Sequence, residues 1–325
     1  MRMRPVWVFN GDWYRSGCAV CMPSQRGLRG AWIVMSSSVR RPSSWLAVFC
    51  LGVSLACVPG MASSPAGAAT GSDACGALIA KTAGGTWSCT FVDNFAGTTL
   101  DASKWAVQDS SQTSFTMNGS CFDGRGVSVS GGFLHLDVRK QSQTCTTLLG
   151  QRGTDYLGAG VSAWGKFAQT FGRFEVRMRF PAYAAPGLHG GFWMNPKDRS
   201  YGIWPGSGEI DVAEWYSRAS DHVYPSLHYT GSIGLLDTKW DCTVTDPTAF
   251  HRFAVEWGPN TIDFIYDRKL CFSRSWTPLD LFPPAPFDRP FTLALVAASG
   301  SGGNAPTLQT PFPSRFDVDY VKAWS

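Results

Sequence analysis

Charged residues are scarce in this chain, and they form no long run of one sign. Among 325 residues there are 28 lysines and arginines and 24 aspartates and glutamates, so charged residues make up 16% and the net charge is +4. Proteins that bind nucleic acid or an anionic membrane surface usually concentrate basic residues in one patch. We therefore expect no nucleic acid partner.

Helical periodicity is also lacking, since no segment longer than about ten residues repeats its apolar side chains every 3.6 positions. Alternation with a period of two recurs instead. Residues 171–180 (FGRFEVRMRF) alternate apolar with charged side chains, as a half-buried antiparallel strand does. Similar strands are predicted at residues 133–139, 224–229, 253–257, 261–266, 291–298 and 316–324, with a hairpin turn at 266–269. The chain should be all-β, built as a two-sheet sandwich.

The N-terminal region lacks an apolar run long enough for a membrane span, which needs about 20 residues. Its apolar stretch, residues 45–58 (WLAVFCLGVSLACV), follows two arginines at 40–41 and precedes the small residues Ala-Gly-Ala at 66–68. This is the order of a secretory signal peptide. We predict a signal peptide over residues 35–68, starting near Met35, and a secreted or extracytoplasmic mature protein with no membrane partner.

Residues 1–34 have no sensible signal architecture. We interpret them as a non-native extension upstream of a misplaced start codon, and the alternative is a genuine cytoplasmic extension. A lipoprotein anchor at Cys57 is a further alternative. It is disfavoured because Ser54 stands where such signals usually carry leucine.

Six of the ten cysteines follow the predicted signal: Cys75, Cys89, Cys121, Cys145, Cys242 and Cys271. An even set in an exported domain indicates disulfides, although the sequence alone does not choose the connectivity. We predict nearest-neighbour pairs, Cys75–Cys89, Cys121–Cys145 and Cys242–Cys271. Cys18 and Cys21 form a lone pair without a second pair at zinc-site spacing, so no metal site is predicted.

The exported part has one change of composition, because residues 62–72 are rich in serine, alanine and glycine. We assign residues 69–89 to a flexible leader with the first disulfide region. Residues 90–325 contain no internal repeat, and a length of about 250 residues suits one large β domain. We predict that this single domain is monomeric.

Residues 207–216 (SGEIDVAEWY) carry three carboxylates in one short apolar stretch. On a strand, alternate side chains share a face, so Glu209 and Asp211 point the same way and Glu214 is off by one. A β-bulge would absorb the extra residue and return Glu214 to the face of the other two. The spacing therefore predicts a bulged strand that aims three acids at one place.

Two carboxyl groups that flank a sugar linkage are the minimum equipment for glycoside hydrolysis. In the retaining form they lie about 5–5.5 Å apart, and one is the nucleophile while the other acts first as acid and then as base. A third carboxylate between them, such as Asp211, could bond a neighbouring glutamate and hold the two protonation states apart.

The segment 202–215 (GIWPGSGEIDVAEW) resembles the active-site strand of glycoside hydrolase family 16 in its bulged E-x-D-x-x-E form. Its Trp-Pro-x-x-Gly-Glu-Ile-Asp run is similar to that of bacterial laminarinases. Five further segments resemble the family in its order: 94–105 (NFAGTTLDASKW), 171–176 (FGRFEV), 250–257 (FHRFAVEW), 286–291 (PFDRPF) and 317–324 (DVDYVKAW). The resemblance covers essentially all of residues 90–325.

The resemblance implies a concanavalin A-like β-jelly-roll sandwich of two curved antiparallel sheets, with a substrate cleft on the concave face. Carried over by position, Glu209 is the nucleophile, Asp211 its electrostatic partner and Glu214 the general acid/base. Catalysis in the family needs no cofactor. A structural calcium is frequent, and Asp319 matches a position that often contributes to it.

Several side chains are candidates for binding sugar. Trp193, Trp204, Trp215 and Tyr216 could stack on sugar faces, and the alternative for each is core packing. The resemblance places Trp193 and Trp204 near the cleft. His228 matches a histidine on the strand beside the active site, either as a substrate contact or as a structural residue.

Two departures from the family bear on the choice of sugar. Laminarinases usually show Trp-Pro-x-Phe-Trp where residues 189–193 read His-Gly-Gly-Phe-Trp, and Val296 stands where asparagine is common. Separately, the arginines on alternate positions of 171–180 could suggest a sulfated polysaccharide. Such alternation is more often a solvated strand face.

We predict an exported, endo-acting, retaining enzyme that cleaves a laminarin-like β-1,3-glucan, because the bulged spacing separates this group from the unbulged E-x-D-x-E enzymes. One alternative keeps the mechanism and changes the polysaccharide to a galactan or another wall polymer. A second alternative is a noncatalytic carbohydrate-binding protein, although such modules typically lose one or both acids. The sequence does not separate hydrolysis from transglycosylation.

Overall fold

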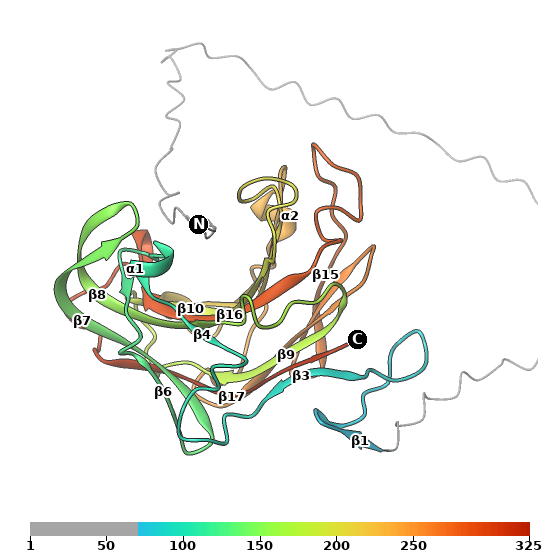
Figure 1. Cartoon of the computed structure of the whole chain (residues 1–325), viewed down its shortest axis with the longest axis horizontal. Helices are drawn as coiled ribbons and strands as arrows, with labels where there is room; N and C mark the ends of the chain where they lie inside the picture. The colour runs from blue at the N-terminus through green and yellow to red at the C-terminus, as the bar shows by residue number, and fades with distance from the viewer. Residues whose placement is uncertain (1–70) are drawn as a thin grey trace, which may run out of the picture. The chain divides into compact units, whose positions relative to one another are not determined.

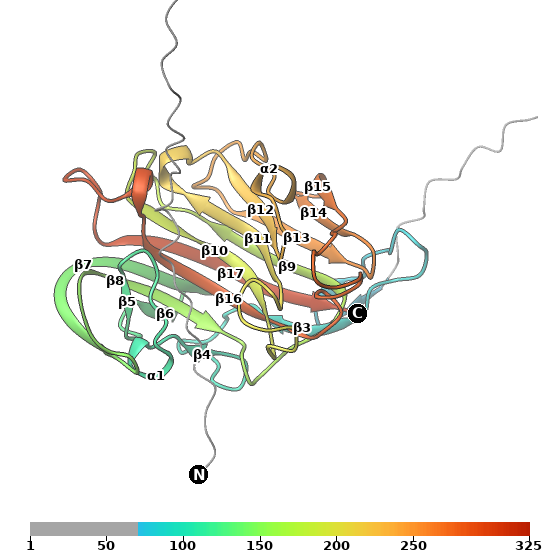
Figure 2. The ribbon, with the colours of Figure 1, turned by 90° about the horizontal axis from the view of Figure 1, so that it is seen from above.

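The computed structural model describes residues 71–325, so the predictions for residues 1–34 and 35–68 lie outside the described part. The described residues form two facing layers of curved antiparallel sheet (Figures 1 and 2). One layer contains, in spatial order, β12 (Val223–His228), β11 (Glu209–Tyr216), β10 (Leu188–Pro196), β16 (Phe291–Ser299) and β8 (Gly150–Ser162). The other contains β15 (Lys269–Arg274), β14 (Ile262–Tyr266), β13 (His251–Trp257), β9 (Gly172–Arg179) and β17 (Ser314–Trp324).

The long strand β7 (Phe133–Thr147) joins the two layers into one continuous sheet. Its first half pairs with β17 and its second half with β8, which in turn pairs with β16. The alternation in the sequence predicted only residues 133–139. Residues 140–147 (KQSQTCTT) have no apolar face, so the second half of β7 carries no hydrophobic signal.

The remaining elements are short. They are β1 (Ser72–Asp73), β2 (Gly76–Ala77), β3 (Cys89–Asp93), β4 (Ala106–Val107), β5 (Cys121–Phe122), β6 (Val127–Ser130), α1 (Ser110–Thr113), α2 (Gly234–Asp237), and the 3-10 turns η1 (Ser217–Ala219) and η2 (Gly302–Asn304). Within the described residues the α-helices are short, as the absence of helical periodicity in the sequence predicted. None of the helices within residues 71–325 has the length and apolar content to cross a membrane.

The strands predicted from alternation are confirmed, with ends that shift by one or two residues except in β7. The predicted hairpin turn is also present between β14 and β15. Its two central residues, Asp267 and Arg268, have φ angles of 47° and 69°, a left-handed conformation that matches the twist of the flanking strands. By contrast, β8 and β10 were not predicted, because both include glycines that break the alternation.

The core between the layers is aromatic, and Trp215 lies in it. Its ring stacks on Phe180 at 5.0 Å and meets Phe316 edge-on at 5.5 Å, and its exposed fraction is 0%. Trp215 follows Glu214 directly, so alternation along β11 sends the two side chains to opposite faces. The prediction that Trp215 stacks on sugar is therefore wrong, and this residue packs the core.

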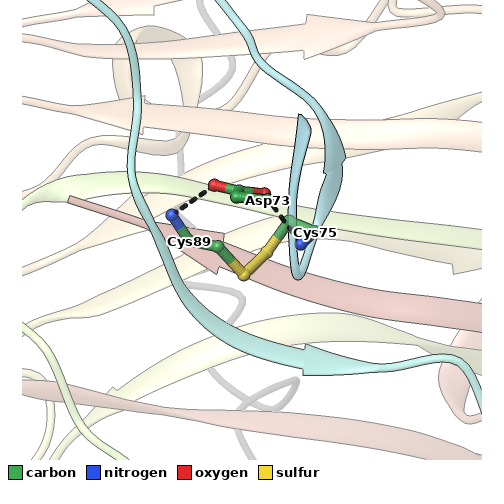
Figure 3. A group of neighbouring side chains, drawn as sticks. All are labelled: Asp73, Cys75 and Cys89. Atoms are coloured by element: carbon green, nitrogen blue, oxygen red, sulfur yellow. Dashed lines mark hydrogen bonds between the residues drawn. A yellow bond between two sulfur atoms is a disulfide. The ribbon is translucent and has the colours of Figure 1, made fainter. Parts of the chain in front are cut away.

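The three predicted disulfides are present, Cys75–Cys89, Cys121–Cys145 and Cys242–Cys271. Figure 3 shows the first of them beside Asp73, whose carboxylate accepts from the backbone amides of Cys75 (2.8 Å) and Cys89 (2.9 Å). These side chains lie as close together as metal ligands would, but both sulfurs are committed to the disulfide. Within residues 69–89, β1 and β2 form a hairpin, and the disulfide ties this hairpin to β3.

Strand β11 carries the predicted bulge. Against β12, Asp211 pairs with Ser226 and Glu214 pairs with Tyr224, so three steps along β11 match two along β12. Val212 and Ala213 both face the core. Glu214 consequently returns to the face of Asp211, as the spacing predicted.

Two neighbours accommodate the bulge. A Cβ atom on Gly191, which pairs with Glu214 across β10 and β11, would lie 1.9 Å from the carbonyl oxygen of Ala213. From the other layer, the buried Tyr266 hydroxyl donates a hydrogen bond to the carbonyl oxygen of Val212 at 2.8 Å. The bulge thus fits because residue 191 has no side chain and because Tyr266 supplies a hydrogen-bond donor to the carbonyl oxygen of Val212.

Replacing Gly191 with alanine should disrupt this arrangement, because the new methyl group would overlap a backbone carbonyl oxygen. We expect Gly191→Ala to lose about 4 kcal/mol or more of unfolding free energy, measured by chemical denaturation. Gly153→Ala is the matched control, since Gly153 also lies in a strand, β8, and has open space where its Cβ would be. Equal stability of the two variants would contradict the account of the bulge.

Candidate active site

The three acids of β11 gather on the face of the sheet that points away from the core. Glu209 lies opposite His228 of β12, and His228 Nε2 is 2.8 Å from Asp211 Oδ2. The charge of Asp211 raises the pKa of Glu209, and the charge of Glu214 raises the pKa of Asp211, in both cases in addition to the larger effect of burial. One bulged strand therefore supplies three interacting carboxyl groups.

Both oxygens of Glu209 accept hydrogen bonds. Asn195 Nδ2, on the neighbouring strand β10, donates to Oε1 at 3.0 Å, and the indole Nε1 of Trp204 donates to Oε2. The Trp204 ring is 41% exposed and lies 5.7 Å from the ring of His228. Glu209 is thus held in one orientation beside an indole that is open to solvent.

Glu214 is held differently, because both of its partners reach the same oxygen. His189 Nε2 lies 2.9 Å from Oε1, and the Tyr216 hydroxyl donates to Oε1 at 2.6 Å. Within residues 71–325 no hydrogen bond reaches Oε2. This second oxygen is therefore the one available to an incoming ligand.

The three carboxyl groups differ in proton affinity. Burial raises the pKa of Glu209 to about 7, and the neighbouring Asp211 charge acts in the same direction. Burial also raises the pKa of Asp211. For Glu214, burial acts upward as well, but the bonds from His189 and Tyr216 outweigh it and lower the pKa below its usual value. Glu209, Asp211 and Glu214 therefore bind protons as an interacting group, so an observed pKa describes the group rather than one residue.

His228 supplies a positive charge to this set. Burial alone would lower its pKa, but the charge of Asp211, the hydrogen bond to it and the charges of Glu209 and Glu214 raise the pKa to about 10. The imidazole is therefore cationic at neutral pH. His228 contacts Asp211 within the protein, and its role as a substrate contact stays a prediction.

Trp193 is largely buried, with 6% of its surface exposed. It packs in a small apolar cluster, separate from the main core, together with Phe115, Phe122 and Val296. Val296 is covered by these rings. The valine that replaces the family's asparagine at position 296 therefore contributes to an apolar cluster and makes no new polar contact.

Four contacts around the acids were not predicted from the sequence. Asn195 lies two residues after Trp193 on β10, so alternation could have placed it on the same face. Tyr216 was considered for stacking rather than for its bond to Glu214, and His189 as a departure rather than as a partner. Asn118 lies in a turn at residues 117–120, and its Nδ2 is 2.9 Å from Nδ1 of His189. Nothing in the sequence predicted this contact.

The arginines of β9 are committed to ion pairs on the outer face of the other layer. Arg173 pairs with Glu175 and Glu256, and it is buried. Arg177 pairs with Asp319. These arginines therefore form neither a free sulfate-binding row nor a simply solvated strand face. A structural calcium near Asp319 stays a prediction.

Comparison with known proteins agrees with this geometry. Residues 99–320 match the family model described as Glycosyl hydrolases family 16. The chain is 32% identical over 207 residues to a "Beta-glucanase" of Rhodothermus marinus, covering 60% of this chain and 69% of that protein. It is 28% identical over 259 residues to "Glucan endo-1,3-beta-glucosidase A1" of Niallia circulans, covering 71% of this chain but only 37% of that protein.

The fold has solved counterparts. The structure of the laminarinase from Rhodothermus marinus superposes with a TM-score of 0.62 at 28% identity, covering 73% of this chain and 97% of the other. The two-layered curved sheet described above is therefore the jelly roll that the resemblance implied.

The proton on His228 can be tested directly. We expect its imidazole to titrate far above 6.5 in the parent protein and to titrate at lower pH in Asp211→Asn, because that variant removes the nearest negative charge. Since the folded-state pKa is raised, the stabilisation by His228 is full below about 6.5 and is lost as the pH rises towards 10. NMR of the imidazole carbon-bound protons measures this, with His222, paired with Asp221, as an internal reference. Titration of His228 below 6.5 in the parent protein would refute the assignment.

Proposed function

The chain belongs to glycosyl hydrolase family 16, and on this premise we propose that it is a retaining endo-β-1,3-glucanase that cleaves laminarin-like polysaccharide by double displacement. The observation that carries the proposal is the bulged strand β11, which brings Glu209, Asp211 and Glu214 to one face. Two relatives support the substrate class, because one is named as a β-glucanase and the other as a glucan endo-1,3-β-glucosidase.

In the first step Glu209 acts as the nucleophile. Its carboxylate, oriented by Asn195 and Trp204, attacks the anomeric carbon and forms a glycosyl ester. The bond from that carbon to the leaving oxygen breaks at the same time. Glu214 donates its proton to this oxygen, so the departing sugar leaves as a neutral alcohol.

In the second step Glu214 acts as the base. Its carboxylate takes a proton from a water molecule, whose oxygen attacks the anomeric carbon and releases Glu209 as a carboxylate. The bonds from His189 and Tyr216 stabilise Glu214 in this charged form. Two displacements at one carbon return the original configuration.

Asp211 and His228 serve this cycle through charge. Glu209 must be ionised to attack, and the cationic His228 offsets the repulsion from Asp211 that raises its pKa. The productive state has one proton on Glu214 and none on Glu209. Activity should therefore be highest at the pH at which the three acids together hold that single proton.

We also propose that the protein acts outside the cytoplasm and as a monomer. Three disulfides support an oxidising compartment. One chain carries all three acids, so the proposed chemistry needs no second subunit. A polysaccharide is the substrate, and the family's catalysis requires no cofactor.

Replacing the nucleophile should abolish turnover. A neutral amide in Glu209→Gln cannot form the glycosyl ester, so we expect kcat to fall by about 10⁴–10⁶-fold, the range seen when one member of a catalytic unit is removed. Both proteins are incubated with laminarin, mixed-linkage β-glucan, agarose and arabinogalactan, and reducing ends and oligosaccharide sizes are measured. Oligomers from laminarin that are absent with the variant support the proposal.

Other outcomes of this panel are equally informative. Cleavage of agarose or arabinogalactan but not laminarin would keep the chemistry and change the substrate. Binding without cleavage of any polymer by the parent protein would identify a carbohydrate-binding protein instead. Full activity of Glu209→Gln would refute the role of Glu209.

Replacing the acid/base should depend on the leaving group. We expect Glu214→Ala to lose activity on laminarin by about 10²–10⁴-fold, because the departing alcohol then receives no proton. An activated aryl glycoside needs no such proton, and azide should accelerate its turnover by attacking the intermediate. The product is then a β-glycosyl azide. If a folded Glu214→Ala forms no azide product, the acid/base assignment fails.

A further inference from the structure

His189 contacts the acid/base, although the laminarinase-like sequence pattern has tryptophan at its position. It lies on β10 with 4% of its surface exposed, and its ring stacks on that of Tyr216 at 4.4 Å. Its Nε2 lies 2.9 Å from Glu214 Oε1, the oxygen that Tyr216 also reaches. Nothing in the two-carboxylate mechanism requires a histidine there.

Asn118 determines which nitrogen of His189 carries the proton. The hydroxyl of Ser301 donates to Asn118 Oδ1 at 2.9 Å, so the amide nitrogen of Asn118 faces the imidazole. That amide nitrogen lies 2.9 Å from His189 Nδ1. An NH₂ group can only donate, so Nδ1 accepts and the proton of the neutral imidazole is on Nε2. His189 therefore donates to Glu214.

The turn that carries Asn118 is anchored to the same sheet. The backbone carbonyl of Asn118 accepts from the Ser299 hydroxyl at 3.0 Å, and the side chains of Ser299 and Ser120 lie 2.9 Å apart. Ser299 ends β16, which pairs with β10 beside His189. Three segments distant in the sequence thus fix the position of the His189 ring, which contacts Glu214 Oε1.

We propose that His189, oriented by Asn118, is a positioning residue that holds Glu214 by one oxygen and favours its carboxylate form. The inference rests on the proposed function, because it assigns Glu214 the acid/base role. It predicts a compromise between the two displacements. A better-stabilised carboxylate is a poorer acid in the first step and is ready as a base in the second.

The electrostatics around Glu214 agree with the geometry. The bonds from His189 and Tyr216 lower the pKa of Glu214 against the upward effect of burial. The other titratable groups that act in this cluster are Asp211 and Glu209 on β11, His228 and Tyr224 on β12, and Tyr266 on β14. None of them donates a hydrogen bond to Glu214 within the described residues, so the two donors on Oε1 are its direct controls.

The test compares His189→Phe, which keeps a flat ring but no donor, with His189→Gln, whose side-chain amide can still donate. The pH dependence of kcat/KM on laminarin is measured for both and for the parent enzyme. Loss of the donor raises the pKa of Glu214, so the limb of the His189→Phe profile that follows the titration of Glu214 should move up by about one pH unit. His189→Gln should stay near the parent profile, and Asn118→Ala should move in the same direction as His189→Phe.

An activated aryl glycoside separates this effect from general damage. Its first step needs no proton, so the alkaline limb of kcat/KM should be absent for every variant. Where its kcat is limited by the second step, the acidic limb should move up in His189→Phe, because Glu214 must then be unprotonated. The control is His222→Phe, which removes a half-buried histidine whose side chain hydrogen-bonds only Asp221 within residues 71–325.

The outcomes are distinct. Limbs that stay in place in a folded His189→Phe, or that move equally in His189→Gln, overturn the proposal. If the parent enzyme cleaves no polysaccharide and no aryl glycoside, there is no profile to compare, and the proposed function itself has failed. If Glu214→Ala without azide still cleaves laminarin as fast as the parent enzyme, the proposed acid/base role of Glu214 is wrong, and with it the premise of this inference.

Discussion

The extra residue in β11 is the constraint on which the site depends. A regular strand would direct Glu214 into the core and Trp215 towards the ligand, and the bulge at Val212 and Ala213 exchanges them. That exchange is possible because Gly191 has no side chain opposite the bulge and because Tyr266 bonds the displaced carbonyl from the other layer. The aromatic core and the catalytic face are therefore set by the same local irregularity.

Gathering three carboxylates on one face creates an electrostatic problem, since burial penalises each charge and each repels its neighbours. The structure meets it with one cation and several neutral donors. His228 balances Asp211, while indole, amide, imidazole and phenol groups bond the two glutamates. The donors are divided unequally, because those of Glu209 take both oxygens and those of Glu214 take one. This asymmetry lets two chemically identical side chains differ in role.

The sequence predicted the features that follow from local rules. Alternation located the strands, the E-x-D-x-x-E spacing required the bulge, and the order of cysteines matched the disulfides. Contacts between distant segments were out of reach, as the contact of Asn118 with His189 shows, because a turn residue carries no periodic signal. The polar half of β7 was missed since neither of its faces is apolar. Trp215 was misassigned because an aromatic residue beside an acid fits a sugar platform and a core equally well until alternation is applied.

The central claim is that the bulged strand presents Glu209 as the nucleophile of a retaining glycosidase. The most direct measurement is mass spectrometry of proteolytic peptides after incubation with an activated 2-deoxy-2-fluoro-β-glucoside of a laminari-oligosaccharide, which slows the second displacement and traps the ester. The account predicts one added glycosyl group on the peptide that contains Glu209, and none in Glu209→Gln. A label on Glu214, or turnover of the natural polysaccharide with inverted configuration, would contradict it.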